Sequence, residues 1–92
     1  MKIGIVGTGK VAYRHFEEFS KIDGVKVEAV CDVNSENLNL FTKKFGNHLR
    51  KYLSVDEMLK EEKNFDGICN NTPDRFHKEV SLKIMEKGIN IF

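Results

Sequence analysis

The 92-residue sequence lacks several features that mark whole classes of protein. It has no apolar run near the roughly 20 residues that a membrane-spanning helix needs. The run at residues 3–6 is too short and too rich in glycine for the core of a signal peptide. A charge excess of one sign is also missing, because 15 Lys and Arg residues face 14 Asp and Glu residues. Nucleic acid and membranes are therefore not expected as partners.

Cysteine is scarce as well. Cys31 and Cys69 form neither a close pair nor a metal-ligand spacing, so both are expected to be free and buried, as in a reducing cytoplasm. The His, Cys, Asp and Glu residues show no metal-binding pattern. No serine or cysteine nucleophile motif occurs either. The sequence therefore predicts neither a metal site nor covalent catalysis.

What the chain does contain is a regular alternation of short apolar runs and amphipathic stretches. Strands are predicted over residues 3–6, 25–31, 49–53, 65–70 and 89–92, and helices over residues 10–21, from Asn34 or Ser35 to Gly46, over 55–62 and from Thr72 to Gly88. Right-handed crossovers between such strands give a parallel sheet covered on both faces. We therefore expect one α/β domain over residues 1–92, a three-layer Rossmann-type fold with strand order 3-2-1-4-5.

Local signals predict the helix ends and one inner face. Asn34 or Ser35 is expected to cap the second helix, and Ser54 with Glu57 has the spacing of a capping box for the third. Gly46 and Gly88 stand where the second and fourth helices should end. The predicted inner face of the fourth helix consists of Phe76, Val80 and Ile84.

Residues 7–12 read Gly-Thr-Gly-Lys-Val-Ala and match the pattern G-x-G-x-x-A between a strand and a helix. In a dinucleotide-binding fold, Gly7 permits the tight turn and Gly9 lets a pyrophosphate approach the backbone. Ala12 lets the helix pack closely against the strand. The pattern alone is a weak signal, but its position between a predicted strand and a predicted helix strengthens it.

Two neighbouring features complete a predicted dinucleotide site. Free backbone N–H groups around Lys10 and Val11 would face the phosphates, with the helix dipole behind them. Asp32 lies 23 residues after Gly9, at the end of the second strand, where a carboxylate meets the adenosine ribose hydroxyls. Because a carboxylate there repels a 2′-phosphate, NAD is expected, and NADP is the alternative. The plainer interpretation is a tight turn and a solvated acid with no ligand.

Residues 70–77 read Asn-Asn-Thr-Pro-Asp-Arg-Phe-His. This segment resembles the T-P-x-x-x-H segment of the glucose–fructose oxidoreductase / inositol dehydrogenase family (Gfo/Idh/MocA). The similarity to that family's N-terminal domain extends over essentially the whole chain. It is carried by GIVGTGKVA at the start, CD at 31–32, residues 54–59, FDGI at 65–68, TPDRFH and EKGINI.

The resemblance implies that Thr72 and Pro73 lie beside the nicotinamide ribose and that His77 lies near the same place. The expected cofactor-binding residues are Gly7, Thr8, Gly9, Lys10, Val11, Asp32, Val33, Asn71, Thr72, Pro73 and His77. His15 is interpreted as a packing or helix-surface residue, and His48 as a solvated loop residue.

The family's Glu-Lys-Pro motif and its substrate-binding domain would follow Phe92, so no catalytic residue is expected within these residues. The resemblance implies hydride transfer between nicotinamide and a secondary alcohol of a sugar, cyclitol or nucleotide-sugar in a longer protein, for which the two free cysteines favour the cytoplasm. Two alternatives stay open: a nucleotide-sensing regulatory module and a scaffold domain that has lost the cofactor. A homo-oligomer also stays open.

Overall fold

Strands and helices alternate along the chain, as predicted. The computed structural model describes residues 1–46 and 48–92. Their elements are β1 (Lys2–Val6), α1 (Lys10–Ser20), β2 (Lys26–Cys31), α2 (Ser35–Phe45), β3 (Arg50–Tyr52), α3 (Val55–Glu61), β4 (Gly67–Asn70), α4 (Asp74–Glu86) and β5 (Asn90–Ile91). Every predicted element is present, with ends shifted by up to two residues.

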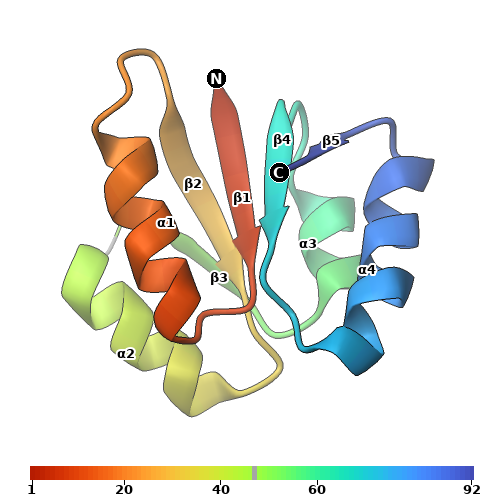
Figure 1. The fold of residues 1–92 in the computed structure, drawn as a ribbon, viewed down its shortest axis with the longest axis horizontal. Coiled ribbons are helices and arrows are strands. Elements are labelled where there is room, and N and C mark those ends of the chain that lie inside the picture. The colour runs from red at the N-terminus through yellow and green to blue at the C-terminus, as the bar shows by residue number, and fades with distance from the viewer. Residues whose placement is uncertain (47) are drawn as a thin grey trace.

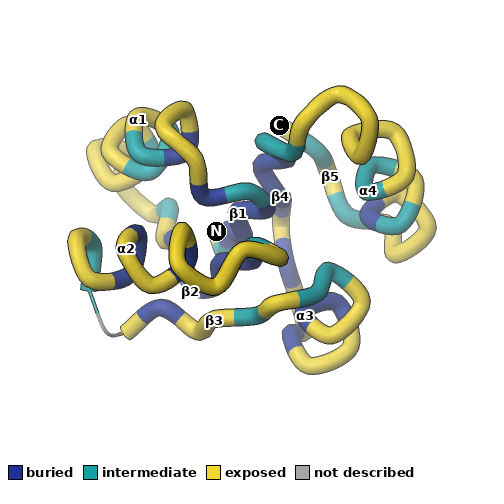
Figure 2. Tube along the Cα trace, turned by 90° about the horizontal axis from the view of Figure 1, so that it is seen from below, coloured by how far each residue is buried: buried dark blue, intermediate teal, exposed yellow. Residues whose placement is uncertain are grey.

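The five strands form one parallel sheet in the order β3-β2-β1-β4-β5, which confirms the predicted topology. Helices α1 and α2 cover one face of this sheet, and α3 and α4 cover the other (Figures 1 and 2). The chain leaves β1 toward α1 on one face and leaves its neighbour β4 toward α4 on the opposite face. This divergence creates the crevice at which ligands bind in open α/β sheets.

Each face of the sheet carries its own apolar core, and the two cysteines belong to different ones. Cys69 packs with Ile3, Ile5 and Phe41 on the side of α1 and α2. Cys31 belongs to the cluster on the side of α3 and α4. The predicted free, buried thiols are confirmed, and the sheet itself separates them.

An irregularity in β2 decides which of its residues face which core. The pairing of β1 with β2 shifts between Ile3, which opposes Val27, and Gly4, which opposes Ala29. Glu28 is the extra residue, so the alternation of side chains between the two faces of the sheet restarts there. As a result Glu28 is half-exposed, although its neighbours along β2, Val27 and Ala29, are buried.

Two of the helix caps were correctly predicted and one helix face was partly wrong. Asn34 and Ser54 accept hydrogen bonds from the backbone N–H groups of Asn37 and Glu57, at 3.0 and 3.1 Å. Phe76, predicted to face the core, is 43 % exposed, because the first turn of α4 projects past the end of β4 and finds no sheet to cover. Ile84, two turns further on, is fully buried.

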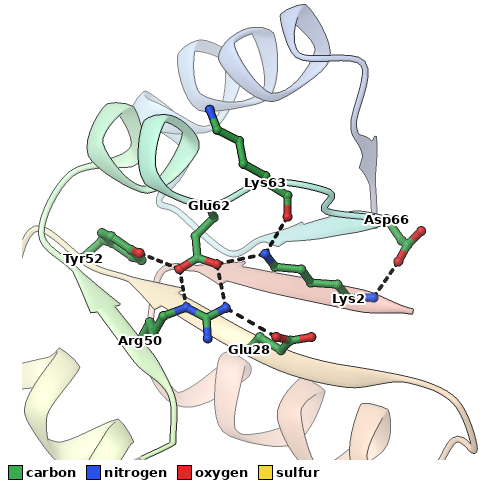
Figure 3. Close-up of polar contacts among 7 residues, drawn as sticks. All are labelled: Lys2, Glu28, Arg50, Tyr52, Glu62, Lys63 and Asp66. Carbon is green, nitrogen blue, oxygen red and sulfur yellow. Dashed lines mark hydrogen bonds and ion pairs between the residues drawn. The ribbon is translucent and has the colours of Figure 1, made fainter.

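An ion cluster around the buried carboxylate of Glu62 ties the amino-terminal ends of β1 and β3 to the segment after α3 (Figure 3). The carboxylate of Glu62 accepts hydrogen bonds from Tyr52 and from Arg50, whose Nη2 lies 2.7 Å from Oε1, and Lys2 Nζ lies 3.0 Å from the same oxygen. Arg50 also contacts Glu28. Chiefly because of the hydrogen bond from Arg50, the pKa of Glu62 falls to about 2. The cluster lies toward the amino-terminal ends of the strands, whereas the glycine turn lies at their carboxyl ends. We therefore assign the cluster a role in stability.

Candidate dinucleotide-binding site

Gly7 ends β1 in a backbone conformation that requires glycine, with φ of +88°. A Cβ at this position would also lie 2.9 Å from the backbone C and O atoms of Asn71, which is too close for any side chain. The Gly7 N–H donates to the carbonyl of Cys31 at 2.8 Å, and the Asn71 N–H donates to the carbonyl of Val6 at 2.8 Å. The glycine turn therefore joins the carboxyl ends of β1, β2 and β4.

Gly9 shows the opposite situation. It precedes α1 in an extended conformation, and a Cβ at this position would meet nothing within 4 Å. No side chain of the described residues caps this helix. Lys10 and Val11 are exposed, whereas Ala12 is fully buried against the sheet. The glycine thus keeps the surface above the positive end of α1 free, as an approaching pyrophosphate requires.

The carboxylate of Asp32 lies at the end of β2 and turns toward the glycine turn. Its Oδ2 accepts hydrogen bonds from the N–H and the hydroxyl of Thr8, each at 2.8 Å. Its Oδ1 accepts one from the N–H of Asn34 at 2.9 Å. The acid and the turn are therefore connected directly, which the sequence spacing had suggested only indirectly.

The Thr-Pro turn after β4 is held by Asn70, a residue that was not predicted to belong to the site. Asn70 is buried, and its Oδ1 accepts hydrogen bonds from the N–H and hydroxyl of Thr72 at 3.1 and 2.7 Å. Its Nδ2 donates to the Ser81 hydroxyl and to the carbonyl of His77. An asparagine two residues before a turn is a recognised sequence signal for this arrangement.

His15, predicted as a packing or helix-surface residue, packs against the end of β4. Its Nδ1 lies 3.0 Å from Asn71 Oδ1 and 3.3 Å from Cys69 Sγ, so this half-buried imidazole joins α1 to the end of β4. The amide nitrogen of Asn71 is buried and has no partner among the described residues. Asn71 was predicted as a cofactor contact, but its side chain turns toward His15 of α1.

The remaining predicted residues occupy the rim of the crevice. Val33 follows Asp32 and is 83 % exposed. Pro73 and His77 are exposed in the first turn of α4, which no side chain of the described residues caps. His48 is exposed, as expected, and lies outside this region.

Exposed apolar side chains recur at this edge of the sheet. One follows the carboxyl end of each of the four strands β1 to β4: Val11, Val33, Leu53 and Phe76. Each exposes between 43 % and 83 % of its surface. A ligand with a planar or apolar part, such as a dinucleotide base, would find contacts here that water does not provide.

Neither thiol is suited to attack a substrate. Burial raises the pKa of Cys31 to about 12, with the negative charges of Asp32 and Glu57 adding to the effect. Burial also raises the pKa of Cys69. Since the thiolate is the reactive form, both cysteines act as small core residues.

One further feature of the described residues lies away from this chemistry. A cavity of about 300 Å³ lies between the carboxyl-terminal half of α1, Phe45 of α2 and the start of β2, at the other end of α1 from the glycine turn. In the part of the chain that the structure describes, no group of three or more His, Cys, Asp or Glu side chains is placed to hold a metal ion.

Among the described helices, none combines the length and the apolar character that a membrane span requires.

Comparison with known proteins agrees with this geometry. A family model described as "Oxidoreductase family, NAD-binding Rossmann fold" matches residues 1–92. The chain is 33 % identical over 86 residues to glucose-6-phosphate 3-dehydrogenase of Bacillus subtilis, a match over 94 % of this chain and 23 % of that protein. It is 25 % identical to a glycosyl hydrolase family 109 protein of Shewanella sp. (strain MR-4), over 100 % of this chain and 22 % of that protein.

A solved structure has the same fold and a similar sequence. The scyllo-inositol dehydrogenase of Lactobacillus casei, crystallised with NAD(H) and scyllo-inositol, superposes with a TM-score of 0.84 at 26 % identity. The match covers 100 % of this chain and 27 % of that one. The chain therefore spans about a quarter of the length of the proteins it resembles.

Proposed function

Since the chain belongs to the Gfo/Idh/MocA oxidoreductase family and carries its NAD-binding Rossmann fold, we propose that it binds NAD(H) across the carboxyl edge of the sheet between β1 and β4. The observation that carries this proposal is the pairing of an open, uncapped helix start at Gly9 with a fixed carboxylate at Asp32. The residues present fit a dinucleotide, because phosphates need free N–H groups and a ribose needs a hydrogen-bond acceptor.

The proposal gives each predicted residue a role. The N–H groups of Lys10 and Val11 face the pyrophosphate, Asp32 accepts from the adenosine ribose, and the exposed Val33 lies against the adenine. Thr72 and Pro73 form the nicotinamide side of the crevice, with His77 on the same rim. The side chains of Thr8 and Asn71 form hydrogen bonds within the protein, so these two residues support the site from below the cofactor.

The direct test is isothermal titration of the purified chain with NADH and with NADPH. We expect heat of binding with NADH and a weaker response with NADPH, because the carboxylate of Asp32 disfavours a 2′-phosphate. No heat with either nucleotide at millimolar concentration would contradict the proposal and favour a scaffold domain that has lost its cofactor.

For the protein that carries this domain, we propose hydride transfer between nicotinamide and a secondary alcohol of a sugar, cyclitol or nucleotide-sugar. When bound, the nicotinamide supplies the hydride chemistry. The residues of this chain bind and orient it, and substrate contacts and the base are assigned to residues outside the 92. The names of the glucose-6-phosphate and scyllo-inositol dehydrogenases support this substrate class. We assign the protein to the cytoplasm, which two free cysteines support.

The likeness to a glycosyl hydrolase family 109 protein favours a second candidate, net hydrolysis of a glycoside. Some glycosidases depend on NAD, so the same cofactor domain serves either reaction. The discriminating measurement is absorbance of reduced nicotinamide at 340 nm in a longer protein containing this domain. A dehydrogenase accumulates NADH in step with product, whereas a hydrolase releases sugar with no net change in NADH. A nucleotide-sensing module binds NADH and produces neither.

A further inference from the structure

Thr8 stands between two glycines in a turn at the edge of the sheet, yet it is only 1 % exposed. Both of its hydrogen-bond donors, the backbone N–H and the hydroxyl, point to one atom, Oδ2 of Asp32, at 2.8 Å each. A buried hydroxyl must have a partner, and here the partner is the carboxylate assigned to the ribose.

These bonds restrict what Asp32 offers to a ligand. A carboxylate has about four lone-pair positions, and three are taken, two on Oδ2 by Thr8 and one on Oδ1 by the N–H of Asn34. The remaining position lies on Oδ1. Any rotation of the carboxylate about its side-chain bonds would break charge-assisted hydrogen bonds, which are stronger than neutral ones.

We propose that Thr8 is a positioning residue that fixes the Asp32 carboxylate and thereby sets the preference for NAD(H) over NADP(H). The inference rests on the proposed function. A fixed carboxylate keeps one oxygen turned toward the ribose and keeps its negative charge where a 2′-phosphate would lie. A carboxylate that loses the bond from the hydroxyl keeps only the two backbone N–H bonds and is held less tightly, which weakens the ribose contact and relieves the repulsion of the phosphate.

The hydroxyl is not needed to close the turn itself. The turn is already tied to β2 by the hydrogen bond from Gly7 N–H to the carbonyl of Cys31, and to β4 through the packing of Gly7 on Asn71. The Thr8 N–H bond to Asp32 also survives any side-chain substitution. What the hydroxyl adds is the second bond to Oδ2, so its removal acts mainly on the carboxylate.

The test is the ratio of the Kd for NADPH to the Kd for NADH, measured by titration on the purified chain. In Thr8→Val, which keeps the shape and removes the hydroxyl, we expect this ratio to fall at least about fivefold, whereas Thr8→Ser should retain it. Thr42 is the matched control, since its buried hydroxyl donates within α2, away from the crevice. Thr42→Val should keep the ratio even if it lowers the melting temperature.

A double-mutant cycle shows whether Thr8 acts through the carboxylate. In the background of Asp32→Ala, Thr8→Val should no longer change the ratio. A ratio unchanged in Thr8→Val, or a fall of equal size in the Asp32→Ala background, overturns the inference. If circular dichroism shows Thr8→Val to be unfolded, Thr8→Ala is judged by the same ratio. Failure of the unmodified chain to bind either nucleotide instead refutes the proposed function, and this inference with it.

Discussion

The peptide of Asn71 closes over Gly7 so tightly that a Cβ at Gly7 would lie 2.9 Å from its carbonyl atoms. The first crossover and the Thr-Pro turn are therefore in direct backbone contact at the junction of β1 and β4. The two halves of the proposed cofactor site share one packing interface.

This contact predicts an unusually large cost for Gly7→Ala. Gly24 has a similar φ of +81° but open space where a Cβ would lie, so Gly24→Ala isolates the backbone strain from the clash. We expect Gly24→Ala to lower the free energy of unfolding by about 1 kcal/mol and Gly7→Ala by about 3 kcal/mol or more. Urea unfolding followed by circular dichroism measures both. Equal losses would show that the Asn71 contact gives way.

Gly9 should behave in the reverse manner. Its φ of −75° suits any residue and its surroundings are open, so Gly9→Val at this N-cap position should lower the free energy of unfolding by no more than about 1 kcal/mol. The added side chain would occupy the space assigned to the pyrophosphate. We expect the Kd for NADH to rise at least about tenfold, with a smaller rise in Gly9→Ala. An unchanged Kd for NADH in the folded valine variant would show that the pyrophosphate does not bind at Gly9.

Asp32→Ala tests the ribose contact. Removal of the carboxylate should weaken NADH binding roughly tenfold or more through loss of a charge-assisted hydrogen bond. Asp23→Ala, which removes an exposed carboxylate in the turn before β2, serves as the control and should bind NADH normally. Titration calorimetry gives both constants. An Asp32→Ala variant with normal affinity would remove this residue from the site.

Glu62 predicts how stability depends on pH. Its pKa is lowered from 4.5 to about 2 in the folded protein, so its contribution is fully present above pH 4.5 and is lost as pH falls toward 2. Glu62→Gln should therefore lower the free energy of unfolding at pH 7 by about 2 kcal/mol. The difference from the unmodified chain should shrink steadily between about pH 5 and pH 2. The exposed neighbour Glu61, changed to Gln, is the control and should change the free energy of unfolding at pH 7 by no more than about 0.5 kcal/mol.

The two thiols should be protected from reagents in the folded chain. The pKa of Cys31 is raised to about 12, and both side chains are buried on opposite faces of the sheet. We expect reaction with a disulfide reagent at about pH 8 to be at least about a hundredfold slower in buffer than in concentrated urea. Mass spectrometry after brief labelling counts the modified residues. Rapid labelling of Cys31 under native conditions would show that its strand opens readily.

The sequence by itself determined the element order, the sheet topology and the edge of the sheet at which the glycine turn and Asp32 lie. These follow from signals that lie close together along the chain: alternating apolar periods, the caps at Asn34 and Ser54, and glycines between a strand and a helix. Right-handed crossovers then leave few arrangements for the sheet. Gly7, Gly9 and Asp32 could be placed at its carboxyl edge on this basis alone.

Only the tertiary structure decided which side chains meet. Thr8 and Asp32 are 24 positions apart, and His15 and Asn71 are 56 apart, so no local pattern pairs them. The extra residue Glu28 shifts the register of β2, and Phe76 projects beyond the sheet. Such contacts depend on strand register and on the exact length of each element, because a shift of one residue turns a strand's side chains to the other face.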